Sequence, residues 1–231
     1  MNAIIVSSTE NVTLLGGGKA RPDELDEALG LAPVLVAADG GAAYALARGR
    51  MPEAVIGDLD SLPREVRDRI PAGRVHEVGD QISTDFDKAL RSIRAPLVLG
   101  VGFLGRRVDH QLACFNVLVR RADQPCILIG KHDVVFAALP HLSLDLPAGS
   151  RVSLFPMAPV TGRSAGLHWA LDGLEFTPGG VVGTSNRVAH GHRGAVDLAF
   201  DGPGMLVILP RRALGVAMRG ILARNDPDGG R

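Results

Sequence analysis

The stretch PVLVAADGG at residues 33–41 decides the fold, because an apolar run of strand length ends directly in an aspartate and two glycines. The stretch EAVIGDLDS at residues 53–61 repeats this arrangement, with two aspartates after the apolar run. Apolar runs of this length that alternate with helical segments are typical of a parallel sheet with helices on its faces. Ligands of such open sheets bind outside the carboxyl ends of the strands. The two stretches therefore predict an α/β domain whose ligand site lies where the aspartates follow the strands.

Further apolar runs extend this prediction in both directions. Helix signals lie between the runs, as in residues 22–30, which open with a proline and end at a glycine, and in residues 62–71. We therefore predict a Rossmann-like α/β/α domain with a parallel sheet over residues 1–131. Its expected strands span residues 12–15, 33–38, 53–57, 95–101 and 125–130.

The pattern changes after about residue 132. Short β-like stretches follow one another, separated by Gly, Pro, Asp and Ser, and we predict no helix among them. We predict an all-β sandwich domain over residues 132–222 and a polar tail over residues 223–231. The expected strands of this second domain lie within residues 133–139, 142–146, 151–157, 173–177, 195–200 and 204–210.

Composition and charge exclude several classes of protein. The 231 residues include 46% hydrophobic residues and 25 each of basic and acidic residues, so the chain has an ordinary core and no net charge. A neutral chain lacks the basic field that draws proteins to nucleic acids or acidic membranes. Cys114 and Cys126 both lie in apolar runs, which excludes a disulfide framework. No leader pattern and no apolar run of about 18 residues occur, so we predict a cytoplasmic protein without a membrane segment.

Asp58 and Asp60 form a D-x-D pair directly after a predicted strand. Residues i and i+2 of an extended chain point to the same side, so the two carboxylates can share one hard cation. Mg²⁺ prefers oxygen ligands and is usually held by one or two carboxylates together with substrate phosphates. The pair predicts a magnesium–nucleotide anchor, and a turn with an Asx-type cap is the alternative interpretation.

The segment STDFDK at residues 83–88 predicts a helix start with an acid and a base on one face. Ser83 or Thr84 can cap a helix that begins near Asp85. Asp85 and Lys88 are then three residues apart and face the same cleft. The alternative is a solvated ion pair within the helix, which the helix dipole would also favour.

Asp39, Gly40 and Gly41 follow a predicted strand and allow a ligand to approach the backbone closely at a helix start. We predict that they contact phosphate or ribose, and a tight strand-to-helix turn is the alternative. The glycines at residues 16–18 are not a P-loop, because the first Gly and the Ser/Thr of that pattern are missing.

The segment GRRVDH at residues 105–110 combines guanidinium groups with an acid. The guanidinium of Arg107 suits multidentate phosphate contacts, and Asp109 can accept a proton from an attacking hydroxyl. A charged helix start is the alternative interpretation. Each of these signals is weak alone, but together they recur at successive strand ends and predict a Mg²⁺-dependent phosphotransferase that uses a nucleotide.

The motifs resemble those of the thiamine pyrophosphokinase family, over nearly the whole chain and in the right order. The matching stretches are AADGGAAYAL (37–46), PEAVIGDLDSL (52–62), STDFDKAL (83–90), LGRRVDHQLA (104–113), RVSLFP (151–156), GLHWAL (166–171) and TSN (184–186). The resemblance implies transfer of a pyrophosphoryl group from ATP to the hydroxyl of thiamine, with release of AMP. The sequence departs from the family where Arg106 replaces a usual glycine and Cys114 a frequent asparagine.

The resemblance also implies a role for each site residue. Mg²⁺ and the ATP phosphates would be held by Asp58, Asp60 and Asp85, and the nucleotide would be contacted by Asp39, Gly40, Gly41 and Thr84. Lys88 and Arg107 would neutralise negative charge on the transferred group, and Asp109 would orient or deprotonate the thiamine hydroxyl. Thiamine would be bound by Gln81, Trp169, Ser185 and Asn186. A homodimer is implied, in which the thiamine site is shared between subunits.

Two alternatives come from other classes of function. A sugar-nucleotide transferase that holds a divalent cation by a D-x-D pair would explain Asp58 and Asp60, but not residues 83–88 together with residues 105–110. A non-catalytic sensor of thiamine or nucleotide on the same fold would explain the binding residues, but it has no need of the acceptor carboxylate of Asp109.

Overall fold

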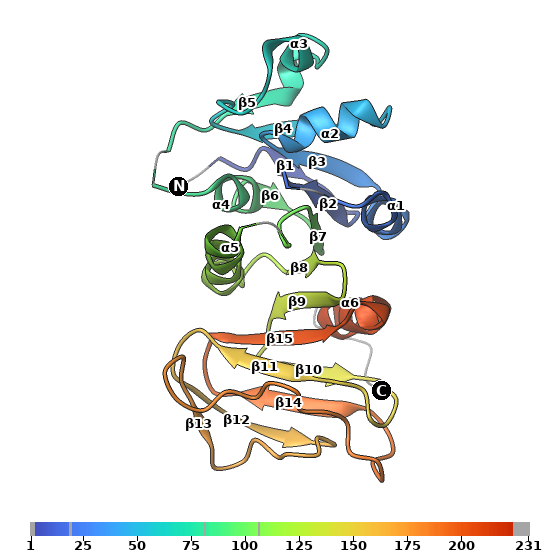
Figure 1. Cartoon of the computed structure of the whole chain (residues 1–231), viewed down its shortest axis with the longest axis vertical. Helices are drawn as coiled ribbons and strands as arrows, with labels where there is room; N and C mark the ends of the chain where they lie inside the picture. The colour runs from blue at the N-terminus through green and yellow to red at the C-terminus, as the bar shows by residue number, and fades with distance from the viewer. Residues whose placement is uncertain (1–2, 19, 81, 106, 224–231) are drawn as a thin grey trace. The chain divides into compact units, whose positions relative to one another are not determined.

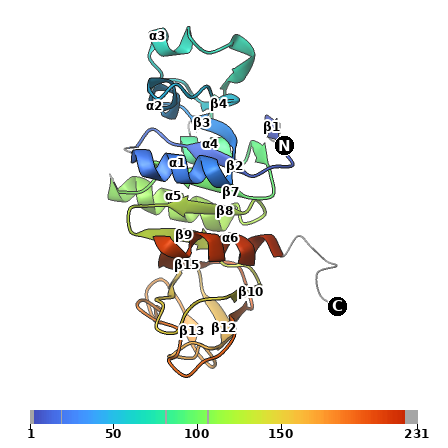
Figure 2. The same ribbon diagram turned by 90° about the vertical axis from the view of Figure 1, so that its right-hand side faces the viewer.

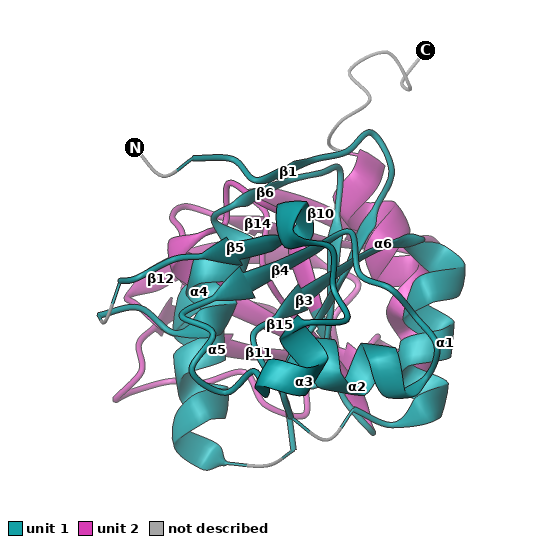
Figure 3. Ribbon diagram, turned by 90° about the horizontal axis from the view of Figure 1, so that it is seen from above, with its two compact units in different colours: residues 1–117, 128–131 teal, residues 118–127, 132–231 magenta. Residues whose placement is uncertain are grey.

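The computed structural model describes residues 3–18, 20–80, 82–105 and 107–223. The chain forms two compact units (Figure 3). Unit 1 comprises residues 1–117 and 128–131, and unit 2 comprises residues 118–127 and 132–231. The division into a catalytic domain that ends at residue 131 and a binding domain that begins at residue 132 stays a prediction.

Unit 1 contains a parallel sheet in the strand order β7-β2-β3-β4-β5, with β8 next to β7 (Figure 1). All five predicted strands are present, because each apolar run is buried. The strands are β2 (Val12–Leu15), β3 (Val34–Ala38), β4 (Ala54–Gly57), β5 (Val75–Glu77), β7 (Val98–Val101) and β8 (Cys126–Ile129). A small parallel pair, β1 (Val6–Ser7) with β6 (Ile93–Arg94), was not predicted, and neither was β5; these strands are only two or three residues long.

The helices of unit 1 lie on both faces of this sheet. The chain moves in one direction from β2 to β4 and in the other from β7 to β8, so right-handed crossovers place their helices on opposite faces. Figure 3 shows α1 and α2 on one side of the strands and α4 and α5 on the other. The helices are α1 (Pro22–Leu31), α2 (Gly41–Ala47), α3 (Arg64–Arg67), α4 (Asp85–Leu90) and α5 (Val108–Arg120), with a 3₁₀ turn at Ala72–Arg74.

Unit 2 is mainly antiparallel. One four-stranded sheet has the order β10-β14-β12-β13, and β15 pairs with both β11 and β9. The elements are β9 (Asp133–Ala137), β10 (His141–Leu144), β11 (Ser153–Pro156), β12 (Val160–Ala165), β13 (Glu175–Phe176), β14 (Val196–Phe200), β15 (Met205–Pro210), a 3₁₀ turn at Arg211–Ala213 and α6 (Leu214–Leu222). A mixed α/β chain with a large sheet and a separate antiparallel sheet is thus confirmed.

The helix α6 corrects the prediction that the second half has no helix. It packs beside β10 (Figure 2). Its sequence hides the helix because Gly215 and Gly220 lower the helix propensity. Gly220 has a packing reason, since a Cβ there would lie 2.8 Å from the carbonyl oxygen of Ser143. The close contact with the neighbouring strand therefore requires a glycine at position 220, although glycine has a low helix propensity.

Candidate active site

Asp39 lies at the end of β3 in a strained and buried place. Its φ of +42° is in the left-handed region, which aspartate tolerates better than most residues. The side chain is only 3% exposed, and its Oδ1 has no hydrogen-bond partner among the described residues. Gly57 on the neighbouring strand leaves it room, because a Cβ at Gly57 would lie 2.9 Å from the Cβ of Asp39. A buried, unpartnered carboxylate oxygen is costly unless something else completes the site.

Asp58 and Asp60 lie on a turn that is held in place by the buried side chain of Leu59 between them. Leu59 between them has a φ of +64° and is buried in a cluster with residues of β3, β4 and α2. The amide of Asp60 contacts Oδ1 of Asp58 at 3.4 Å, and Oγ of Ser61 donates to Oδ1 of Asp60 at 2.9 Å. The Asx-type turn therefore coexists with a half-buried Asp58 and an exposed Asp60, so the two interpretations of D-x-D are not exclusive.

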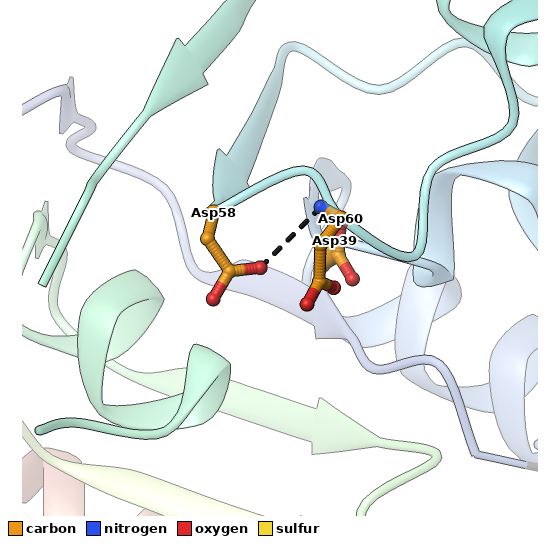
Figure 4. Close-up of side chains that lie close together, drawn as sticks. All are labelled: Asp39, Asp58 and Asp60. Carbon is orange, nitrogen blue, oxygen red and sulfur yellow. Dashed lines mark hydrogen bonds between the residues drawn. The ribbon is translucent and has the colours of Figure 1, made fainter. Parts of the chain in front are cut away.

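The carboxylates of Asp39, Asp58 and Asp60 meet at the ends of β3 and β4 (Figure 4). One oxygen from each lies within 4.8 Å of the others. Burial, followed by the negative charge of Asp85, raises the pKa of Asp39 above its ordinary value. Three close carboxylates with one buried, unpartnered oxygen form a donor set that fits a hard divalent cation. The sequence interpretation placed Asp39 on the nucleotide side, whereas the structure brings it beside the D-x-D pair.

Lys88 joins this cluster to Asp85. The lysine is 1% exposed, and its Nζ lies 2.6 Å from Oδ2 of Asp58 and 3.3 Å from Oδ1 of Asp85. Burial lowers the pKa of Lys88, but hydrogen bonds and charge from the two aspartates outweigh it and leave the pKa above its ordinary value. The ammonium is therefore charged at neutral pH and stabilises both carboxylates in a largely water-excluded place.

The two aspartates on Lys88 differ in acidity. The hydrogen bond from Lys88 holds the pKa of Asp58 below its ordinary value. Burial, followed by the charge of Asp58, raises the pKa of Asp85. The predicted helix start is confirmed, because Thr84 precedes α4 and its Oγ1 accepts from the amide of Asp87 at 3.3 Å. Asp85 and Lys88 form an ion pair within α4, as the alternative interpretation had it, but the pair is not solvated, because Lys88 is buried.

Arg107 and Asp109 form an exposed pair at the start of α5. Nη2 of Arg107 donates to Oδ2 of Asp109 at 2.5 Å, and Nε donates to Oδ1 at 3.1 Å. The hydrogen bonds from Arg107 lower the pKa of Asp109 below its ordinary value. In this arrangement Asp109 is a weak base, so acceptance of a proton requires that the arginine turn to another anion.

The strand-end loops beside the acids touch one another through glycines. A Cβ at Gly18 would lie 2.2 Å from the carbonyl oxygen of Gly102, and a Cβ at Gly41 would lie 2.1 Å from that of Leu15. These loops follow β2, β3 and β7, and the order in which the chain adds strands to the sheet reverses between β2 and β7. Open sheets bind ligands at such a reversal. Gly41 therefore has a packing role, and Gly40 beside it is half-buried at the start of α2.

Unit 2 presents Trp169 as an exposed aromatic ring. The guanidinium carbon of Arg187 lies 4.7 Å from the ring centre, and the ring of His168 meets it edge-on at 4.6 Å. Arg187 was not singled out from the sequence, because a single arginine after TSN carries no pattern. An exposed ring with a cation on it can receive a flat ligand by stacking.

Asn186 holds the backbone of Trp169. The side chain is 3% exposed, Nδ2 donates to the carbonyl of Trp169 at 2.8 Å, and Oδ1 accepts from the amides of Trp169 and Arg187 at 3.2 and 2.8 Å. Ser185 is exposed, has a φ of +62°, and its amide donates to Oγ of Ser153 at 3.0 Å. Of the predicted thiamine residues, Trp169, Ser185 and Asn186 thus lie close together, and Gln81 lies outside the described residues.

The fold and the site define a class of protein: an α/β unit with a carboxylate cluster and a buried lysine at its strand ends, followed in sequence by an antiparallel unit. The family models described as "Thiamin pyrophosphokinase, catalytic domain" and "Thiamin pyrophosphokinase, vitamin B1 binding domain" match residues 25–129 and 141–203. Together they cover well over half of the chain. The chain belongs to the thiamin pyrophosphokinase family.

Individual relatives agree with this assignment. The chain is similar to thiamine pyrophosphokinase 1 of Arabidopsis thaliana, with 30% identity over 63% of this chain and 62% of that protein. It is similar to thiamine pyrophosphokinase 1 of rice, Oryza sativa subsp. japonica, with 31% identity over 59% of each chain. The match thus spans less than two thirds of these curated relatives. A solved thiamin pyrophosphokinase from Candida albicans shares the fold, with a TM-score of 0.70 and 17% identity over 89% of this chain and 92% of that one.

Within the described ranges, none of the helices combines the length and the apolar character that a membrane span requires.

Proposed function

We propose that this chain transfers a diphosphoryl group from ATP to the hydroxyl of thiamine and so produces thiamine diphosphate and AMP. The observation that carries the proposal is the buried Lys88, which joins the carboxylate cluster to Asp85. Membership of the thiamin pyrophosphokinase family supports the choice of substrates. Transfer of a phosphoryl-type group depends on alignment and on compensation of negative charge more than on covalent chemistry of the protein.

The acids of unit 1 are proposed to hold magnesium. Asp58 and Asp60 would bind it, with Asp85 as the further ligand implied by the family resemblance and Asp39 as the ligand suggested by the cluster. The cation, when bound, neutralises charge on the phosphates and aligns them. The unpartnered Oδ1 of Asp39 supports this proposal, because a bound cation would give this buried carboxylate oxygen a partner.

The protein's own groups are proposed to complete the nucleotide site. On a Rossmann-like arrangement of unit 1, ATP would lie across the strand ends against Gly40, Gly41 and Thr84. Lys88 would bind the diphosphoryl group from the buried side and Arg107 from the exposed side. Both are cationic, which compensates the charge that shifts toward the leaving AMP.

The acceptor step is proposed to involve Asp109. The hydroxyl oxygen of thiamine attacks the β-phosphorus of ATP, the bond from this phosphorus to the α,β-bridging oxygen breaks, and AMP leaves with that oxygen. The hydroxyl proton passes to the carboxylate of Asp109. Binding of phosphate by Arg107 would release Asp109 from their mutual pair and raise its basicity, which couples arrival of the nucleotide to acceptance of the proton.

Thiamine is proposed to bind through residues of unit 2 and through Gln81. Trp169 would stack on the heterocycle, Ser185 and Gln81 would offer polar contacts, and Asn186 would hold Trp169 in place through the bonds described above. We further propose that residues 1–131 act as the catalytic domain, that residues 132–222 form a thiamine-binding β-sandwich, and that residues 223–231 are a tail. A cytoplasmic homodimer with a shared thiamine site completes the proposal.

A product assay tests the function. The purified chain is incubated with thiamine, ATP and MgCl₂, and the products are separated by chromatography. Thiamine diphosphate and AMP in equal amounts are the expected result. Formation of thiamine monophosphate and ADP would contradict the diphosphoryl transfer. Tight thiamine binding without product would favour the sensor, and turnover only of a sugar nucleotide would favour the D-x-D transferase.

A further inference from the structure

Asp80 lies just ahead of the segment that leads into α4, and one carboxylate serves three partners. Its Oδ1 accepts from the amide of Ile82 at 2.8 Å, and its Oδ2 accepts from Oγ of Ser83 at 2.7 Å. The guanidinium of Arg91 donates to the same Oδ2 from both Nη1 and Nη2 at 3.1 Å. None of these residues belongs to the site proposed above.

These hydrogen bonds hold a segment that hydrophobic packing does not hold. Ile82 is 99% exposed, Ser83 is half-buried and Thr84 is exposed, so residues 82–84 place no apolar side chain in the core. A segment without buried apolar contacts keeps a single conformation only through its hydrogen bonds. The described hydrogen bonds from the amide of Ile82 and the hydroxyl of Ser83 both go to the carboxylate of Asp80.

Arg91 ties the other end of α4 to the same carboxylate. It follows the last residue of the helix, and its amide donates to the carbonyl of Asp87 at 3.1 Å. The side chain is 11% exposed and its guanidinium reaches Asp80, which precedes the helix in sequence. Asp80 and Arg91 therefore clamp α4 at both ends, and Asp85 and Lys88 lie between the clamped residues.

The body of α4 is held by packing, because residues 86–90 of this six-residue helix are buried, whereas its first residue, Asp85, is half-buried and follows the unpacked segment 82–84. Lys88 must nevertheless keep its Nζ within 2.6 Å of Asp58, which belongs to a different strand end. Displacement of a catalytic group by about 1 Å can cost about 100-fold in rate.

We propose that Asp80 and Arg91 are positioning residues for the transfer reaction, which hold the start of α4 so that Lys88 and Asp85 stay aligned on Asp58. The inference rests on the proposed function, and it predicts different effects on kcat and on thiamine binding. Loss of the clamp should lower kcat more than it raises the KM for thiamine, because Asp80 and Arg91 make no described bond to Trp169, Ser185 or Asn186, and Gln81 beside Asp80 is the one proposed thiamine contact near the clamp.

The test compares Asp80→Ala, Asp80→Asn and Arg91→Lys with a matched control. Glu53→Gln removes the acid of another ion pair of unit 1, in which Glu53 and Arg74 meet at 3.3 Å. Supporting partners of this kind typically change activity 10- to 100-fold, so we expect kcat to fall roughly 10- to 100-fold in Asp80→Ala and less in Asp80→Asn and Arg91→Lys. The KM for thiamine should change by a smaller factor than kcat, because Gln81 is one of four proposed thiamine contacts, and Glu53→Gln should match the wild type.

Hydrogen exchange supplies a readout that needs no turnover. In Asp80→Ala the amide of Ile82 should lose protection because its acceptor is removed, and the amide of Asp87 because its acceptor, Oγ1 of Thr84, loses support; in Glu53→Gln both should keep it. Unchanged kcat in a folded Asp80→Ala protein would overturn the inference, and so would a rise in the KM for thiamine without a change in kcat. If the wild type produces no thiamine diphosphate, the proposed function fails, and the exchange experiment still decides whether Asp80 holds the start of α4.

Discussion

The carboxylate cluster of unit 1 and the Trp169 segment of unit 2 are both proposed to bind substrates, but they are built in opposite ways. In unit 1, Asp39 is buried with an unpartnered oxygen and close to other acids. In unit 2, the amide of Asn186 is equally buried, and both its oxygen and its nitrogen are bonded to backbone. The first region is incomplete, because a buried oxygen has no partner, whereas the second is finished, because both polar atoms of its buried amide are bonded. A substitution should therefore have opposite effects on stability in the two regions.

The largest effect is expected for Lys88→Met. The substitution keeps most of the length of the buried side chain but removes its charge, so Asp58 and Asp85 are left facing each other without compensation. We expect kcat/KM to fall by about 1000-fold, as for loss of a group that stabilises transition-state charge. Steady-state assays of product formation measure the loss. Lys131→Met, which changes an exposed lysine, is the control, and equal activity of the two variants would remove Lys88 from the mechanism.

Asp39→Asn tests the incomplete region. The shape is kept and one negative charge is removed, so the affinity for Mg²⁺ should fall roughly 10- to 100-fold in calorimetric titration. Without divalent cations the variant should be more stable, because repulsion within the cluster is relieved. A gain of about 1 kcal/mol corresponds to a rise in Tm of about 2–4 °C. A lower Tm without metal would break the comparison on which this prediction is based.

Asn186→Ala tests the finished region and should have the opposite sign. The substitution leaves the part-buried amide and carbonyl of Trp169 without their partners, and an unsatisfied group costs up to about 1–3 kcal/mol of stability. The KM for thiamine should rise while the Mg²⁺ dependence stays as in the wild type. Urea unfolding measures the first effect and steady-state kinetics the second. Asn116→Ala, at an exposed asparagine of α5, should stay within about 0.5 kcal/mol of the wild type.

The smallest effect concerns the pH dependence of stability through Asp80. Hydrogen bonds from Ser83, Ile82 and Arg91 hold the pKa of Asp80 well below its ordinary value. A carboxyl group with a lowered pKa stabilises the fold above its unfolded pKa of about 3.9, and this stability is lost as the pH falls toward the folded value. The difference in Tm between wild type and Asp80→Asn should therefore shrink as the pH falls below about 4. A difference that stays constant down to pH 2 would contradict the prediction.

Local patterns were sufficient for most of the elements. The apolar runs that became β2, β3 and β4 were predicted within one residue, because buried parallel strands leave a continuous hydrophobic signal. The start of α4 was predicted because Thr84 is a typical cap. The strand β12 was missed, since Gly162 and Arg163 interrupt its apolar pattern. Gly162 is needed there because a Cβ would lie 2.6 Å from the carbonyl oxygen of Ala199 on the paired strand.

The sequence by itself determined which residue types follow the strands, namely aspartates and glycines, and from these a magnesium–phosphate site was predicted. Strand order, which depends on contacts between distant segments, decided which acids meet. Ala38 of β3 pairs with Ile56 of β4, so Asp39 lies beside the D-x-D turn although 19 residues separate it from Asp58. Burial of Lys88 between two acids was likewise invisible in the pattern D-x-x-K, because a local pattern specifies which residues share a helix face but not what that face is packed against.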